Sequence, residues 1–191
     1  MKTVFFDIDT QRDFVYPAGA LYVPGAEKIL PVVARLNRHA AAHGIPLIST
    51  ADAHAQNDAE FRDWPPHCVK GAHGQRKAAG TLIEQHSIIP NSPGPLNPAP
   101  QMIVEKQALD CFTNVNLPPL LDALGADRYV VYGVVTEFCV RSAVFGLLRT
   151  GRQVEVVTDA IRSLSEDASR AALDEFTRRG ARLTTAAELF L

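Results

Sequence analysis

The 191-residue sequence predicts an α/β protein in which a parallel sheet carries helices on both faces. Short apolar runs rich in β-branched residues alternate with segments whose apolar residues recur every three or four positions, as in amphipathic helices. Glycines stand where four of those helices should end, at Gly44, Gly125, Gly151 and Gly180. In such sheets ligands bind beyond the carboxyl ends of the strands, so those ends are the first place to look for a site.

The expected elements follow one another in regular order. The segments expected to form strands are residues 3–9, 45–51, 102–105, 129–135, 153–158 and 182–184. The segments expected to form helices are residues 26–43, 117–124, 137–150, 165–179 and 186–190. Two stretches interrupt this order. Residues 52–76 are polar and irregular, and residues 90–100 contain five prolines, which predicts a surface loop, a lid or a subunit contact.

The composition predicts a single domain over residues 1–191 that acts on a small molecule. The chain is 47% hydrophobic with a net charge of −2, and no basic stripe is present, which argues against a nucleic-acid partner. Its first apolar run is too short for a signal peptide, and no run approaches the roughly 20 residues of a membrane span. Three sparse cysteines argue against a disulfide framework, so we expect a cytoplasmic protein without a membrane partner.

Cys139 is a candidate nucleophile. It follows the apolar strand 129–135 and lies at the start of the helix 137–150, with Thr136 as a plausible N-cap. The unpaired N–H groups and the positive dipole at a helix N-terminus favour an anion, which would lower the pKa of the thiol. The alternative is an inert, buried thiol, because free cysteine often behaves as a small hydrophobic residue. A nucleophile would also need a base and an oxyanion site.

Two charged side chains at strand ends are candidate partners for that thiol. Asp9 closes the first strand and is a candidate general base, and strand alternation places Asp7 on the same face, where repulsion could raise a carboxyl pKa. Lys106 closes the strand 102–105, and its ammonium would favour a thiolate, although a strand-end lysine is commonly solvated. The Asp7 to Asp9 segment also resembles the first motif of haloacid-dehalogenase-type, Mg-dependent phosphatases, but Gln11 stands where that motif has Thr or Val.

A second constellation has the composition of a metal site. In extended geometry Asp52 and His54 lie on one face, two residues apart, and His67 follows in the irregular stretch. Two imidazoles and one carboxylate leave coordination positions open, which is typical of a catalytic or substrate-binding metal. His73 is a further candidate ligand, whereas His39, His43 and His86 are expected to be solvated. The sequence assigns no function to the proline-rich loop at residues 90–100.

Three separated segments resemble one protein family. Asp9 with the following Gln-Arg-Asp-Phe, the strand-end Lys106, and residues 133–141 around Cys139 are similar to the Asp-Lys-Cys cysteine hydrolases of the isochorismatase-like superfamily. Asp52-x-His54 and the segment Trp-Pro-x-His-Cys-Val ending at residue 69 narrow the resemblance to its nicotinamidase-like branch. The similarity runs in order from about residue 3 to residue 158.

The resemblance implies a three-layer α/β/α fold with a six-stranded, mainly parallel sheet, and hydrolysis of an amide to an acid and ammonia through a thioester. Asp9 would take the thiol proton, Lys106 would bridge Asp9 and Cys139, and Cys139 would attack the amide carbonyl. The oxyanion hole would use the backbone N–H groups of Val135 and Cys139, next to a cis peptide bond between Val134 and Val135.

The same resemblance implies a cofactor and a substrate. A divalent metal, Zn first with Fe or Mn as alternatives, would bind Asp52, His54 and His67 and hold the pyridine nitrogen of nicotinamide. The substrate-binding aromatic residues would be Phe14, Trp64 and Phe138. Relatives assemble as dimers or tetramers, so we expect a homo-oligomer, and turnover of nicotinamide would place the enzyme in NAD salvage.

Two departures from the family pattern keep other substrates open. Alanines flank the Asp52-x-His54 pair where nicotinamidases carry Trp and Pro, and residues 107–112 lack the expected Ser and aromatic pattern. A metal-poor relative that hydrolyses a carbamoyl, ureido or maleamate-type amide is therefore the main alternative. Two less favoured alternatives are a Mg-dependent phosphatase built on Asp7 and Asp9 and a binding scaffold without catalytic activity.

Overall fold

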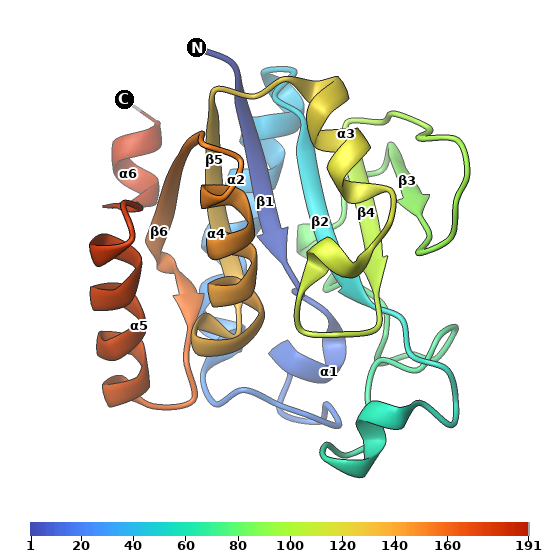
Figure 1. Cartoon of the computed structure of the whole chain (residues 1–191). Coiled ribbons are helices and arrows are strands. Elements are labelled where there is room, and N and C mark those ends of the chain that lie inside the picture. Colours follow the sequence, from blue (N-terminus) through green and yellow to red (C-terminus); the bar gives the residue numbers. More distant parts are fainter. Residues whose placement is uncertain (191) are drawn as a thin grey trace.

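The computed structural model describes residues 1–190 and contains a seven-stranded, parallel sheet between two layers of helices (Figure 1). The strand order is β3-β4-β2-β1-β5-β6-β7, and every neighbouring pair is parallel. The strands are β1 (Thr3–Ile8), β2 (Leu47–Asp52), β3 (His86–Ile89), β4 (Gln101–Lys106), β5 (Arg128–Val134), β6 (Gln153–Arg162) and β7 (Arg182–Thr184). The sheet thus has one strand more than predicted. The additional strand, β3, is four residues long with a mostly exposed or half-buried pattern, so it gives almost no apolar signal in the sequence.

The helices flank the sheet on both sides. They are α1 (Arg12–Val15), α2 (Leu30–Ala42), α3 (Leu117–Leu124), α4 (Arg141–Leu148), α5 (Glu166–Arg178) and α6 (Ala186–Leu189). Helices α3, α4 and α5 cover one face, and α2 lies behind the sheet on the other (Figure 1). The helix predicted over residues 26–43 is a 3₁₀ turn (Ala26–Ile29) followed by α2, and the one predicted over 137–150 is a π-type turn (Thr136–Val140) followed by α4. None of the helices within residues 1–190 has the length and hydropathy of a membrane-spanning segment.

The four glycines predicted to end helices all adopt a positive φ. Gly125 illustrates the reason: with φ 56° it ends α3 and donates its N–H to the carbonyl of Leu121 at 2.9 Å. Gly133 has a different function. A Cβ at this position would lie 2.1 Å from the carbonyl oxygen of Ile8, so only glycine lets the ends of β1 and β5 approach this closely. Directly after it, the peptide bond between Val134 and Val135 is cis.

A buried polar network lies on the α2 side of the sheet. Asp7 is fully buried, and its carboxylate lies 2.9 Å from Nζ of Lys77. The same carboxylate accepts hydrogen bonds from Thr10 Oγ1 at 2.8 Å and from Asn37 Nδ2 at 2.7 Å, while the Tyr132 hydroxyl donates to Asn37 Oδ1. Buried charges are stable when they are paired and their lone pairs are satisfied, and this network meets both conditions.

Candidate active site

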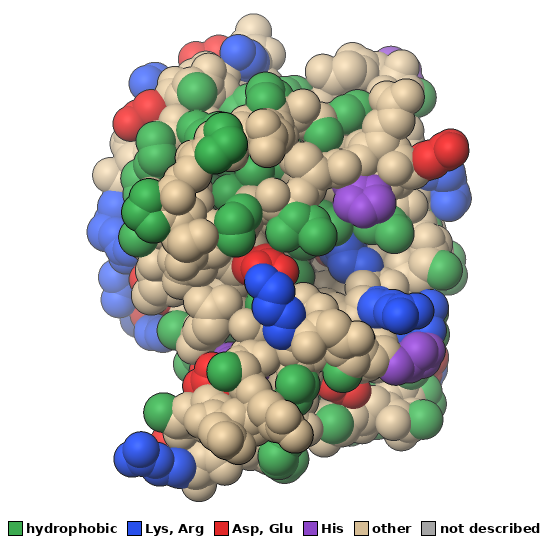
Figure 2. Space-filling model, turned by 90° about the vertical axis from the view of Figure 1, so that its right-hand side faces the viewer, with side chains coloured by type: hydrophobic (Ala, Val, Ile, Leu, Met, Phe, Trp, Pro, Cys, Tyr) green, Lys and Arg blue, Asp and Glu red, His purple; other side chains and the backbone are tan. Residues whose placement is uncertain are grey.

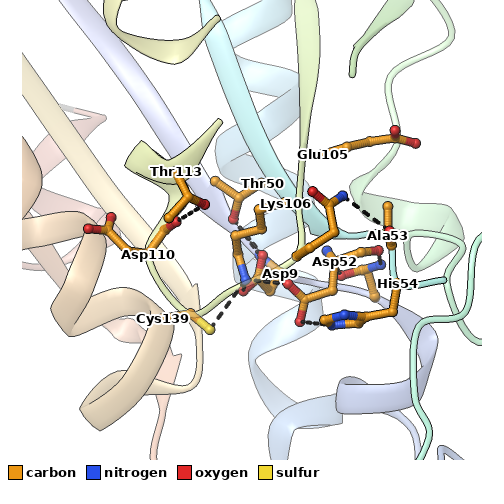
Figure 3. Close-up of polar contacts among 12 residues, drawn as sticks. Asp9, Thr50, Asp52, Ala53, His54, Glu105, Lys106, Asp110, Thr113 and Cys139 are labelled. Carbon is orange, nitrogen blue, oxygen red and sulfur yellow. Dashed lines mark hydrogen bonds and ion pairs between the residues drawn. The ribbon is translucent and has the colours of Figure 1, made fainter. Parts of the chain in front are cut away.

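Lys106 lies at the centre of the group of charged residues at the carboxyl edge of the sheet. This side chain is fully buried at the end of β4, where strand register pairs it with Asp52 at the end of β2. Its Nζ is 2.9 Å from Oδ2 of Asp9 and 3.5 Å from Sγ of Cys139, and it donates a hydrogen bond to Oδ1 of Asp52 (Figure 3). Burial works against the charge, but Asp52 and Asp9 outweigh it and hold the Lys106 pKa well above its ordinary value. The ammonium is therefore a buried structural charge and not a solvated one.

Asp9 follows β1 in a left-handed backbone conformation, with φ 49°, which turns its side chain into the site. Its Oδ1 accepts a hydrogen bond from Thr50 Oγ1 at 2.6 Å. Burial raises the pKa of this carboxyl and Asp52 adds to the rise, while Lys106 and Thr50 oppose it. The predicted contribution of Asp7 is wrong, because Asp7 lies on the α2 side in its own ion pair with Lys77. This placement also removes the basis for a phosphatase site shared by Asp7 and Asp9.

Cys139 lies in the π-type turn that leads into α4, and 6% of the residue is exposed. The N-cap position is occupied by Val135, and the Thr136 hydroxyl is buried without a hydrogen-bond partner, so the predicted cap is wrong. Burial raises the thiol pKa well above its ordinary value, Lys106 opposes the rise, and Asp9 and Asp52 reinforce it. The expected lowering of the thiol pKa is therefore wrong as well, and the Asp9 carboxylate is adjacent to the thiol.

The predicted metal triad converges in one place. Nε2 of His54 and Nε2 of His67 lie 3.8 and 3.7 Å from Oδ2 of Asp52. Candidate ligand atoms of all three residues lie within 4.8 Å of one another. The convergence depends on residues 67–70, which pair with His54: the His54 N–H donates to the Cys68 carbonyl and the Lys70 N–H to that of His54.

The triad fits a divalent metal. Nε2 of His54 is buried and has no hydrogen-bond partner, as expected for a nitrogen whose lone pair faces an ion. Nδ1 of His67 lies 2.8 Å from the carbonyl of Pro65. Nδ1 of His54 also has no hydrogen-bond partner by geometry, but it lies 3.1 Å from the carboxylate oxygen Oδ2 of Asp58. Such outer contacts orient ligating imidazoles in metal sites. His73 is exposed beside Arg12 and does not belong to the group.

Two further residues near the triad were missed in the sequence. Glu60 is half-buried in the wall of the site, and burial raises its pKa. The Phe61 ring packs against both imidazoles, with centroids 5.3 Å from His54 and 5.7 Å from His67. Both residues lie in a 3₁₀ turn (Ala59–Arg62) whose N-terminus is capped by the Asp58 side chain. The Asp-Ala-Glu-Phe sequence at residues 58–61 carries this cap signal, although the segment lies within the stretch that we expected to be irregular.

A pocket with about 550 Å³ of free space opens above these groups. Asp9, Cys139 and Val135 contribute to its wall. The three aromatic residues predicted to bind substrate, Phe14, Trp64 and Phe138, also line it. The rings of Trp64 and Phe138 meet edge to face with centroids 5.7 Å apart, so they form a continuous aromatic part of the pocket wall, which suits a planar aromatic molecule.

Gln11 and Asp13, in the segment that follows β1, support the metal triad. The fully buried Gln11 carboxamide donates to the Asp52 carbonyl at 2.8 Å and accepts the Asp52 N–H at 2.7 Å. Asp13 accepts the N–H of Cys68, the neighbour of His67, at 2.7 Å. The segment after β1 thereby holds the Asp52 backbone and the backbone beside His67, and the sequence alone did not indicate this support.

The departure at residues 107–112 has a structural explanation. The Asp110 carboxylate accepts the N–H of Phe112 at 2.9 Å and caps a 3₁₀ turn (Cys111–Thr113), a function that a serine could also perform. Asp110 does not line the pocket, whereas Leu109 does. Gln107 donates its side-chain N–H to the carbonyl of Ala53, so this segment supports the strand end beside the triad.

Comparison with known proteins identifies the family. The isochorismatase domain family matches residues 3–80 and 91–188. The chain belongs to the isochorismatase family. Nicotinamidase of Escherichia coli is 27% identical over 208 residues, covering 95% of this chain and 93% of its own. Maleamate amidohydrolase of Pseudomonas putida is 25% identical over 174 residues, covering 90% and 78%.

A solved structure agrees with this assignment. Pyrazinamidase of Pyrococcus horikoshii, determined in complex with zinc, superposes with a TM-score of 0.83 at 29% identity and covers 97% of this chain and 99% of its own. The chain is thus a nicotinamidase-like member of the isochorismatase family and a hydrolase that acts on carbon–nitrogen bonds of amides. The predicted family, fold class and reaction class are confirmed, and the predicted number of strands is wrong by one.

Proposed function

We propose that this amidohydrolase cleaves a small planar amide, with nicotinamide first, to the acid and ammonia through a thioester on Cys139. One observation carries the proposal: the buried Lys106 ammonium contacts Asp9, Asp52 and Cys139 at once, beneath an aromatic pocket. It joins a base, a nucleophile and the metal triad in a single site.

In the acylation step, Asp9 accepts the proton of the Cys139 thiol, and Sγ forms a bond to the amide carbonyl carbon. Lys106 keeps its charge and stabilises the thiolate as it forms. The carbonyl oxygen becomes an anion that accepts hydrogen bonds from the N–H groups of Val135 and Cys139, and removing one such donor typically costs about 3 kcal/mol of barrier. Asp9 then returns its proton to the amide nitrogen, the C–N bond breaks, and ammonia leaves.

In the deacylation step, the same carboxylate changes its role. Asp9 takes a proton from a water molecule, whose oxygen attacks the thioester carbon. The C–S bond breaks, the carboxylic acid is released, and the proton held by Asp9 returns to Sγ. The raised pKa of Asp9 supports this assignment, because a base that must also return its proton works best when its pKa approaches the working pH.

Asp52, His54 and His67 would hold a divalent metal, Zn first with Fe or Mn as alternatives. When bound, it would supply a positive charge that attracts the lone pair of a ring nitrogen. Phe14, Trp64 and Phe138 would orient the ring so that the amide carbonyl faces Sγ.

Nicotinamide is favoured over an amide that carries a carboxylate. Of the described residues that line the pocket, none is Lys or Arg, while three are carboxylates: Asp9, Asp52 and Glu60. An anionic substrate would therefore find no basic side chain on the wall to pair with. A maleamate-type amide is the second candidate, and it is kept because of the similarity to maleamate amidohydrolase.

An ammonia-release screen tests the proposal. Nicotinamide, maleamate and an N-carbamoyl amino acid would be compared on the wild-type enzyme, with Asp9→Asn as the inactive control. We expect the highest kcat/KM with nicotinamide. Faster turnover of maleamate than of nicotinamide would assign the enzyme to the second candidate, and no ammonia from any amide would refute the proposed site.

The homo-oligomer and the cytoplasmic location stay predictions. Analytical sedimentation would test the oligomeric state, and cell fractionation would test the location.

A further inference from the structure

A second cavity lies on the α2 side of the sheet and shares no lining residue with the active-site pocket. It is an open groove with about 790 Å³ of free space, its mouth included, beside β4 and the edge strand β3. This face of the molecule is hollowed, and Lys, Arg and His side chains gather around the hollow (Figure 2). We call this cavity the edge groove.

The edge groove combines an apolar floor with a basic wall. Apolar side chains of Ala51, Leu82, Ile88 and Ile103 contribute to its surface, and Ile88 is 55% exposed. The basic wall comes from two paired backbone segments: Gln11 and Lys77 form an antiparallel bridge, and the Arg12 N–H donates to the Arg76 carbonyl at 2.9 Å. This pairing brings two guanidinium-bearing residues to the same wall.

Within residues 1–190, neither arginine of the wall is neutralised by a carboxylate, although Nη1 of Arg12 contacts Nε2 of His73. Lys77 is neutralised by Asp7 at 2.9 Å. Glu105 is the one carboxylate among the described lining residues, and it is paired with Lys70 at 2.8 Å. Among the described residues, neither Arg12 nor Arg76 has a carboxylate within ion-pair distance. In addition, Nε of Arg12 is buried without a hydrogen-bond partner. A buried, unpartnered guanidinium donor in a cavity wall indicates that something else satisfies it.

We propose that the edge groove binds a small organic oxyanion, namely a carboxylate on a compact apolar body. The carboxylate would accept hydrogen bonds from Arg12 and Arg76, whose planar guanidinium groups match its geometry. The apolar body would lie on Ile88 and Ile103, which removes their exposed surface from water. This ligand differs from the neutral amide favoured in the catalytic pocket.

The Gln11 side chain connects the edge groove to the active site by hydrogen bonds. Gln75 lines the groove, and its backbone carbonyl accepts a hydrogen bond at 2.7 Å from Nε2 of Gln11. The same side-chain nitrogen donates to the backbone carbonyl of Asp52. A ligand in the groove therefore contacts a segment that is bonded directly to the support of the metal triad.

Isoleucine-methyl NMR with benzoate as the probe tests the inference. Ile88 and Ile103 line the groove, and no isoleucine is among the described residues that line the catalytic pocket, so the methyl signals separate the two sites. We expect saturable shifts at these two residues with benzoate, weaker binding of inorganic phosphate, and none of neutral benzyl alcohol. Arg76→Ala should weaken benzoate binding about tenfold, and Arg76→Lys less, since a hydrogen bond to a charged group contributes on that scale.

The matched control is Arg152→Ala, which removes an exposed arginine outside the groove and should leave benzoate binding unchanged. The inference would be overturned if benzoate caused no saturable shift at Ile88 and Ile103, if Arg76→Ala bound it as wild type does, or if phosphate or benzyl alcohol bound equally well. Because binding is read without turnover, such a failure would leave the proposed amidase chemistry untouched, and the reverse also holds.

Discussion

Two buried lysine–aspartate pairs involve Asp7 in β1 and Asp9 directly after it, and the two pairs have different surroundings. Asp7 and Lys77 meet on the α2 side at 2.9 Å, and Asp9 and Lys106 meet at the carboxyl edge at the same distance. All four side chains are buried. The distance between the charges therefore does not distinguish an inert pair from a reactive one.

The difference lies in the other partners of each pair. The Asp7 carboxylate is satisfied by neutral donors from Thr10 and Asn37, and it does not line the catalytic pocket. Lys106 instead divides its charge among Asp9, Asp52 and the Cys139 thiol, beside a pocket that admits a ligand. A buried pair stabilises the fold when its partners are complete, and it becomes available for chemistry when a titratable third partner and a cavity are present.

Replacing the Cys139 thiol should have the largest effect on kcat. Cys139→Ser replaces the nucleophilic sulfur by a smaller and less nucleophilic oxygen, and we expect kcat to fall by about 10⁴-fold or more, as for other lost nucleophiles. The far-ultraviolet circular dichroism should stay that of the wild type. Residual turnover above one per cent of wild type, in protein free of wild-type contamination, would show that another group performs the attack.

The two aspartates provide a matched test of the comparison. Asp9→Asn should lower kcat by about 10²- to 10⁴-fold, because the amide cannot take the thiol proton. Asp7→Asn leaves the Lys77 charge unpaired, so the free energy of unfolding should fall by about 3–5 kcal/mol while the folded fraction keeps its kcat. Urea denaturation and steady-state kinetics on both variants measure this. Equal loss of kcat in the two variants would contradict the distinction between the pairs.

The positions of the reactive groups could be anticipated from the sequence. Asp9 and Lys106 end apolar segments and Cys139 follows one, and the carboxyl ends of parallel strands meet at one edge of a sheet. The structure brings these residues together, and their catalytic roles remain proposals. Asp52, His54 and His67 have a spacing that already indicates a metal site.

What could not be anticipated depends on three-dimensional surroundings. The thiol pKa of Cys139 is raised because the sulfur is buried near two carboxylates, and a local helix-dipole argument omits both terms. The role of Asp7 depends on Lys77, which lies 70 residues away in the chain. Glu60 and the supporting amide of Gln11 contribute through loop packing that has no periodic signal.

Removal of the metal should separate binding from chemistry. In chelator-treated enzyme we expect KM for nicotinamide to rise by about 10- to 100-fold, the scale on which disturbed metal sites lose function. Benzamide is the matched control, because it lacks the ring nitrogen, so its KM should change little. Metal content before and after treatment is measured by mass spectrometry. An unchanged KM for nicotinamide in metal-free enzyme would refute the role of the triad in holding the ring.

The smallest effect concerns pH. Asp9 must be ionised to accept the thiol proton, and its pKa is raised above the ordinary value of 3.8, so activity should be complete above the raised pKa and be lost as pH falls through it. The acid limb of kcat/KM should therefore have its midpoint above 3.8, and Asp7→Asn should leave that midpoint unchanged. A midpoint at or below 3.8, in protein shown to be folded, would argue against Asp9 as the base.

The most direct measurement is mass spectrometry of acid-quenched enzyme during turnover of nicotinamide. We expect the peptide that contains Cys139 to carry the acyl group of the substrate, with a mass increase equal to nicotinamide minus ammonia, and hydroxylamine to remove it. Cys68 and Cys111 should stay unmodified in the same digest. An unmodified Cys139 in enzyme that is shown by product release to be turning over, or an acyl group on another residue, would contradict the thioester mechanism.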